Sequence, residues 1–130
     1  MTHAKTDWHA RARALSIKGR AFINGRYVAA ANGATFDCVS PIDGRILAQV
    51  ASTDVADADL AVAAARQAFE SGAWSRLPPR ERKRVMLRFA ALIERHAEEL
   101  ALLETLDMGK PIADSLAVDI PATVRCVTWY

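Results

Sequence analysis

The chain has 130 residues, of which 52% are hydrophobic and 25% charged, and its formal net charge is +2. This composition is typical of a soluble globular chain, either one domain or a piece of a larger one, and it excludes a disordered segment. The net charge is too small to argue for nucleic acid or an anionic membrane, and we expect neither as a partner. No apolar run approaches the about 18 residues of a membrane-spanning helix.

Residues 1–20 are basic and irregular, and we expect them to form an N-terminal arm. The stretch DWHARARALSIK can form a short helix that packs Trp8 and Leu15. A targeting presequence is the alternative, because such segments are also rich in arginine. Asp7 and the weak amphipathic pattern count against it.

Residues 21–51 are predicted to form four short antiparallel strands. In AFINGRYVAA, Asn24-Gly25 supplies the positive φ values that a type I′ hairpin turn needs. The stretch TFDCVSPIDGRILAQVA indicates a second hairpin around residues 40–44. Asn32-Gly33 provides a turn between the two hairpins.

Beyond the strands, the apolar spacing predicts helices over about 54–130. Asp54 can cap the first helix, and Gly72 suits its end. Trp74 follows that end and is expected in the core. One apolar face is formed by Val55, Ala58, Val62, Ala65 and Phe69.

The second helix is expected to open at Pro78-Pro79 and to break near His96. Asp119 can cap a last helix, with Pro121 tolerated in the first turn. That helix continues to Tyr130 without a glycine, proline or polar stop. This pattern is what a chain truncated before further domains would show.

The stretch LETLDMGKPIADS, residues 103–115, contains a Gly-Lys pair that could belong to a phosphate-binding loop. Such a loop needs glycine where this chain has Glu104, and serine or threonine where it has Pro111. No GxGxxG spacing exists elsewhere. The better interpretation is a helix corner, in which Gly109 ends one helix, Lys110 favours its negative end and Pro111 starts the next.

Neither metal-binding nor nucleophilic residues form a recognisable pattern. The three histidines, His3, His9 and His96, lack ligand spacing. Cys38 and Cys126 form no CxxC pair and are expected to be buried packing residues. The basic run over residues 80–88 is interrupted by glutamate and predicts a solvated helix face rather than a nucleic-acid surface.

The chain resembles the N-terminal part of the NAD(P)-dependent aldehyde dehydrogenase superfamily from about Phe22 to Tyr130. The resemblance depends on a set of motifs in the family's order: FINGRYV, SPIDGRILAQV, DVADADLAVAAARQAF, Trp74 and LPPRERKRVMLRFAALIERHAEELALLETLDMGKP. It implies an α/β fold and, more finely, the subgroup that oxidises gamma-glutamyl-aminobutyraldehyde or guanidinobutyraldehyde. The segment would then be the N-terminal portion, residues 21–130, of a cofactor-binding domain.

The resemblance also implies site residues. A monovalent cation, K⁺ or Na⁺, would be held by the carbonyl of Val39 and the carboxylate of Asp107, although Cys38 stands where relatives often have threonine. Asp119 matches an aspartate near the substrate entrance of aminoaldehyde-oxidising relatives, where it could attract an amino-bearing tail. Helix capping and helix-end hydrogen bonding are the structural alternatives for Asp119 and Asp107.

The hypothesis is therefore an aldehyde dehydrogenase that uses NAD or NADP to oxidise a small aldehyde, with polyamine-derived aminoaldehydes as the finer guess. The catalytic cysteine, the glutamate and the cofactor fingerprint of the family lie outside these residues, so this segment alone is expected to be inactive. A cytoplasmic homo-oligomer, dimer or tetramer, is expected. The alternative is a non-catalytic helical interaction module derived from the same family.

Overall fold

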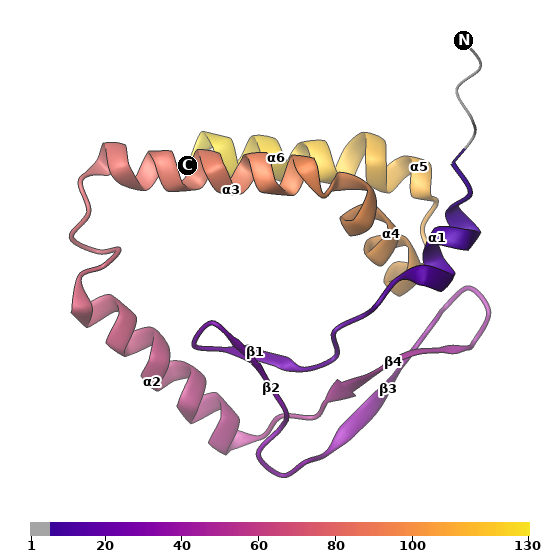
Figure 1. Cartoon of the computed structure of the whole chain (residues 1–130), viewed down its shortest axis with the longest axis horizontal. Helices are drawn as coiled ribbons and strands as arrows, with labels where there is room; N and C mark the ends of the chain where they lie inside the picture. Colours follow the sequence, from indigo (N-terminus) through magenta and orange to yellow (C-terminus); the bar gives the residue numbers. More distant parts are fainter. Residues whose placement is uncertain (1–5) are drawn as a thin grey trace.

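The structure, a computed structural model, describes residues 6–130, so His3 and the other residues of 1–5 lie outside it. In the N-terminal arm, helix α1 (Trp8–Ala14) begins at Asp7, whose carboxylate accepts a hydrogen bond from the amide of Ala10 at 2.9 Å. The short helix expected in the arm is confirmed, and Trp8 and Leu15 are both half-buried. Figure 1 shows α1 beside α4.

Two separate antiparallel strand pairs follow the arm. β1 (Ala21–Ile23) pairs with β2 (Arg26–Val28), and β3 (Thr35–Val39) pairs with β4 (Ile46–Ala51). The two turn residues between β1 and β2 have φ values of 50° and 75°, as a type I′ turn requires. The four short antiparallel strands predicted for residues 21–51 are confirmed.

The arm reaches β4 through a close backbone contact at Gly19. The carbonyl of Gly19 accepts a hydrogen bond from the amide of Ala51 at 2.7 Å. A Cβ at Gly19 would lie 1.8 Å from the carbonyl oxygen of Gln49. Only glycine allows this approach, because any side chain would occupy the space of the β4 backbone.

Helix α2 (Val55–Ser71) starts with a reciprocal capping box between Asp54 and Asp57. The carboxylate of Asp57 is buried and also accepts a hydrogen bond from the amide of Ala31 at 3.0 Å. It therefore ties the turn after β2 to the helix start. Gly72 ends the helix with a φ of 79°, so both predicted ends are confirmed.

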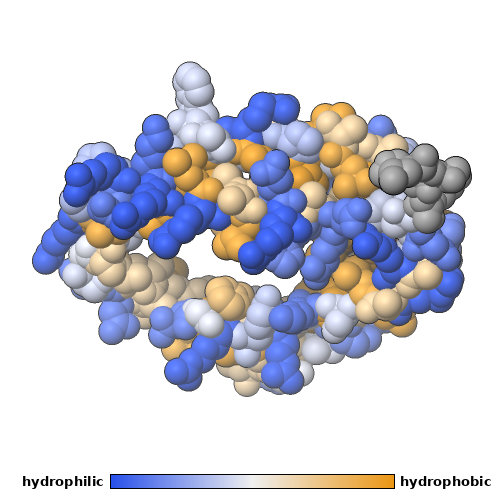
Figure 2. Space-filling view, turned by 45° about the horizontal axis from the view of Figure 1, so that its top comes forward, coloured by the Kyte–Doolittle hydropathy of each residue, from blue (hydrophilic) through white to orange (hydrophobic). Residues whose placement is uncertain are grey.

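The apolar face of α2 has the predicted spacing but little cover in this chain. Val55 is 76% exposed and Phe69 61%. Figure 2 shows apolar side chains on both sides of an opening through the middle of the molecule. The prediction of a core position for Trp74 is wrong here, because this residue lies in the connection beyond α2 and is 44% exposed.

The remaining chain forms a packed helical half. It comprises α3 (Pro79–Arg95), α4 (Ala97–Met108), α5 (Ile112–Asp114), a π-helical turn η1 (Ser115–Asp119) and α6 (Ile120–Trp129). Figure 1 shows α6 lying along α3 in the opposite direction, with α4 set at an angle beneath them. None of the helices within residues 6–130 is both long and apolar enough to cross a membrane.

The buried residues of the helical half lie mainly where α3 and α4 meet their neighbours. The break predicted near His96 is confirmed, because this residue separates α3 from α4. Ser115 is fully buried, and its hydroxyl lies 3.2 Å from that of Thr105, which satisfies both polar groups. The buried apolar side chains of this half are Ala90, Ile93, Ala101, Leu102 and Leu106.

Candidate functional site

The corner after α4 has the geometry predicted from the sequence. Gly109 has a φ of 76° and donates its amide to the carbonyl of Thr105 at 2.9 Å, which ends α4. Pro111 then precedes the first residue of α5. The Gly-Lys pair is thus part of a helix corner and not of a phosphate loop.

The turn between β3 and β4 packs against this corner. A Cβ at Gly109 would lie 3.0 Å from the ring of Pro41, so glycine serves the close approach as well as the positive φ. Ser40 is buried, and its hydroxyl accepts a hydrogen bond from the amide of Ile42 at 3.2 Å. Hydrogen bonds from Ser40 and from the backbone amide of Arg45 lower the pKa of Asp43 below its ordinary value. The β3–β4 turn and the corner after α4, which are far apart in the sequence, therefore form one surface.

Cys38 of β3 contacts Asp107 of α4. The thiol of Cys38 lies 3.5 Å from Oδ1 of Asp107, and both line a cavity of about 410 Å³. Desolvation and the neighbouring Asp107 carboxylate raise the pKa of Cys38, so the thiol stays protonated and is a poor nucleophile. Cys126 is exposed, so the expectation of buried packing is wrong for this residue.

The cation site inferred for Val39 and Asp107 can be compared with this geometry. Val39 directly follows Cys38, at an irregularity of the β3–β4 register, and the thiol of Cys38 contacts Asp107. A carboxylate and a backbone carbonyl suit a hard monovalent cation, whereas a protonated thiol does not. Within residues 6–130, no group of three or more His, Cys, Asp or Glu side chains forms a metal site.

Asp119 lies at the end of the π-helical turn. The expectation that it caps α6 is wrong, because its backbone is helical and its side chain makes no cap hydrogen bond. The amide of Ile120 donates to the carbonyl of Ser115, five residues back. The π-helical turn comes directly before the helix that contains Pro121, a residue with no amide hydrogen to donate to a regular α-helix.

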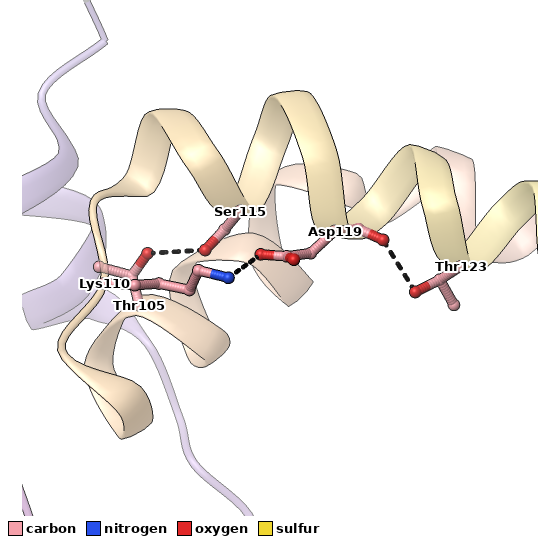
Figure 3. A network of polar contacts seen from close by, with 5 residues as sticks. All are labelled: Thr105, Lys110, Ser115, Asp119 and Thr123. Carbon is pink, nitrogen blue, oxygen red and sulfur yellow. Dashed lines mark hydrogen bonds and ion pairs between the residues drawn. The ribbon is translucent and has the colours of Figure 1, made fainter.

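The carboxylate of Asp119 forms an ion pair with the ammonium of Lys110, which reaches across from the corner (Figure 3). Both side chains are partly buried, at 28% exposed for Lys110 and 34% for Asp119. The backbone carbonyl of Asp119 accepts a hydrogen bond from the hydroxyl of Thr123 at 2.9 Å. The pair therefore joins the corner to the π-helical turn.

The hydrogen bond to Asp119 raises the pKa of Lys110, and the negative charges of Asp119, Glu104 and Asp114 add to the shift against partial desolvation. Lys110 thus remains charged at physiological pH. The sequence suggested that Lys110 favours the negative end of α4, whereas its ammonium pairs with Asp119.

A cavity of about 540 Å³ opens beside Asp119. Its charged residues are Asp119 and Glu104, and its apolar wall includes Ile93, Leu100 and Ile120. A carboxylate beside an apolar wall can contact the polar end and the hydrocarbon part of the same small molecule.

This arrangement of strands, corner and helices is shared with known proteins. Residues 27–130 match the profile described as "Aldehyde dehydrogenase family". The chain belongs to the aldehyde dehydrogenase family. It is 49% identical to the NADP/NAD-dependent aldehyde dehydrogenase PuuC of Escherichia coli over 98% of its own length and 26% of that protein.

Two solved structures extend the likeness to the fold. Indole-3-acetaldehyde dehydrogenase AldA of P. syringae, in complex with NAD⁺, is 67% identical with a TM-score of 0.93, over 95% of this chain and 25% of that one. Gamma-glutamyl-gamma-aminobutyraldehyde dehydrogenase from Burkholderia cenocepacia is 58% identical with the same TM-score of 0.93 and the same shares, 95% and 25%. The predicted fold class, short antiparallel strands followed by helices at the N-terminus of an aldehyde dehydrogenase, is confirmed. The chain spans about a quarter of these relatives.

The sequence located the corner but missed its side-chain partners. Lys110 and Asp119 are nine residues apart, which is not a regular helical spacing, so periodicity gave no sign of their contact. The sequence around Glu104 argues against a phosphate loop but does not indicate that this carboxylate lines a cavity. The glycine before the strands, Gly19, also carried no motif that distinguishes it from a loop glycine.

Proposed function

We propose that this segment belongs to an enzyme that oxidises an aldehyde to a carboxylate with NAD⁺ or NADP⁺. In such an enzyme a cysteine thiolate attacks the aldehyde to give a thiohemiacetal, hydride leaves for the nicotinamide, and water releases the acid. The observation that carries the proposal is the match of residues 27–130 to the family. The names of the relatives support either nicotinamide cofactor.

The segment's own part in this reaction is structural and at the substrate entrance. The cysteine, glutamate and cofactor loop of the family match no residue here, and the raised pKa of Cys38 makes it a poor substitute nucleophile. Asp119, on the cavity wall, is the residue proposed to meet the substrate. A cytoplasmic homo-oligomer remains part of the proposal, based on the family resemblance alone.

An amino-bearing aldehyde is the proposed substrate class. The supporting features are the two carboxylates, Asp119 and Glu104, and the apolar wall of the same cavity. An alkyl chain that ends in an ammonium group would complement both. The Burkholderia relative, named for a gamma-aminobutyraldehyde derivative, supports this class.

A neutral aromatic aldehyde is the second candidate. It is favoured by the 67% identity to an indole-3-acetaldehyde dehydrogenase and by the neutralisation of Asp119 by Lys110. The two candidates predict opposite orders of kcat/KM for 4-aminobutyraldehyde and indole-3-acetaldehyde.

The test uses a protein of the relatives' length that contains this segment. The measured quantity is the aldehyde-dependent formation of NADH or NADPH. We expect turnover with the long protein and none with the 130 residues alone. No turnover with any aldehyde by the long protein would contradict the enzyme proposal and favour the interaction module. Turnover by the isolated segment would contradict its assigned supporting role.

A K⁺ or Na⁺ ion is proposed at Asp107 and the carbonyl of Val39. The proximity of β3 to Asp107 supports it, through the contact at Cys38. In the long protein, replacing K⁺ and Na⁺ by a bulky organic cation at constant ionic strength should lower the melting temperature. Asp107→Asn should remove that dependence, and an unchanged dependence would contradict the site.

A further inference from the structure

We propose that Lys110 is a specificity-determining residue, which offsets the charge of Asp119 and so limits the preference for cationic aldehydes. The inference rests on the proposed function of Asp119 as the residue at the substrate entrance. It adds that the ammonium of Lys110 sets how strongly the Asp119 carboxylate attracts a positive charge.

The geometry that carries the inference is the ion pair between two different elements. Lys110 comes from the corner between α4 and α5, and Asp119 from the π-helical turn (Figure 3). The ammonium takes Oδ2 of Asp119. Oδ1 has no hydrogen-bond partner within the described part of the chain, and Asp119 lines the cavity.

The neighbouring charges show why the Lys110–Asp119 pair controls how strongly the cavity attracts a cation. Around Lys110 lie the carboxylates of Asp119, Glu104 and Asp114, which together favour its charged form. Glu104 and Asp119 also line the cavity, whereas Lys110 does not. An ammonium that enters the cavity therefore meets Glu104 and an Asp119 whose charge is partly offset by the ammonium of Lys110.

Removal of the lysine charge would leave two uncompensated carboxylates on the cavity wall. At a separation of several ångströms in a partly solvated site, one charge changes the binding of a singly charged ligand by roughly three- to tenfold. The sign is fixed by the charges: cations gain, anions lose and neutral aldehydes change little. Salt should reduce the effect because the pair is partly exposed.

The test compares Lys110→Met, Lys110→Arg and Asp119→Asn in the long protein, with 4-aminobutyraldehyde, a neutral aldehyde of equal length and succinic semialdehyde. Lys110→Met should lower KM for the cationic aldehyde roughly three- to tenfold relative to the neutral one and raise KM for the anionic one. Lys110→Arg should keep the wild-type KM ratios, because it retains the charge.

Asp119→Asn separates this inference from the proposed function. It should reduce the relative preference for the cationic aldehyde, and the double variant with Lys110→Met should return that preference towards wild type, because both have the same net charge beside the cavity. An unchanged preference in Asp119→Asn would overturn the entrance role of Asp119 and the role of Lys110 with it. A changed preference in Asp119→Asn together with equal KM changes for all three aldehydes in Lys110→Met would overturn the inference about Lys110 alone.

Discussion

The strand half and the helical half of the molecule bury different kinds of residue. In the strand half and the start of α2, the buried positions are Ala30, Ser40 and Asp57, and two of these three side chains are polar. In the helical half, the buried positions are almost all apolar. The first half is therefore held mainly by hydrogen bonds and close backbone contacts, and the second by packing of apolar side chains.

This difference follows from what each half can bury. Short two-stranded pairs offer little apolar area, so they need precise contacts at turns and caps to hold their register. The helices α3 and α6 lie antiparallel with α4 below them (Figure 1), and Ile93 of α3 and Leu102 and Leu106 of α4 are buried. The two halves should therefore respond differently to substitutions of similar size.

The largest effect is expected at the backbone contact of the arm. Gly19→Ala places a methyl group 1.8 Å from the oxygen of Gln49, and backbone cannot yield as a side chain can. We expect a loss of more than about 3 kcal/mol in the free energy of unfolding, at or above the upper end for overpacking. Chemical denaturation measures it.

Gly33→Ala is the matched control for that prediction. Its φ is 71° and no atom lies within 4 Å of the added Cβ. Only backbone strain should therefore lower the free energy of unfolding, by about 1 kcal/mol. If both alanine variants lost equal stability, the strand half would not depend on close backbone approach.

In the helical half, Leu102→Ala should cost about 3 kcal/mol, because it removes buried methyl groups and leaves a cavity. Val62→Ala on the apolar face of α2 should cost less than about 0.5 kcal/mol, since Val62 is 67% exposed. Thermal unfolding of the 130-residue chain compares them. Equal losses would mean that the face of α2 is covered in solution.

Loss of a buried polar group should produce an intermediate effect in the strand half. Asp57→Ala leaves the amides of Ala31 and Asp54 without their acceptor and should cost about 2 kcal/mol. The exposed Asp59 is the control, and its alanine variant should differ little from wild type. A negligible loss for Asp57→Ala would show that solvent replaces the capping contacts.

The smallest effect concerns the ion pair of the helical half and its pH dependence. The pKa of Lys110 is raised in the folded chain, so its contribution to stability is complete below the ordinary lysine pKa and is lost as pH rises through the raised value. The difference in melting temperature between wild type and Lys110→Met should therefore be constant near neutral pH and shrink in strong alkali. A difference that instead grew in alkali would contradict this linkage.

Much of the fold was predictable because local rules determine it. Turn glycines with positive φ, the Asp54 cap, the end of α2 at Gly72 and the corner at Gly109 all depend on conformations that few residues adopt. The break at His96 was likewise visible in the apolar spacing. These features needed no knowledge of what packs against them.

The sequence by itself thus determined the elements, their ends and, through its set of motifs, the family. Tertiary structure decided what local patterns cannot contain: the contact of Gly19 with Gln49, the meeting of Cys38 with Asp107, and the pairing of Lys110 with Asp119. In place of the expected cap, Asp119 forms an ion pair with Lys110, because its backbone continues a π-helical turn and does not begin a new helix. Contacts between residues distant in sequence arise from the packing of whole elements. The periodicity of one helix or strand does not predict which element packs against it.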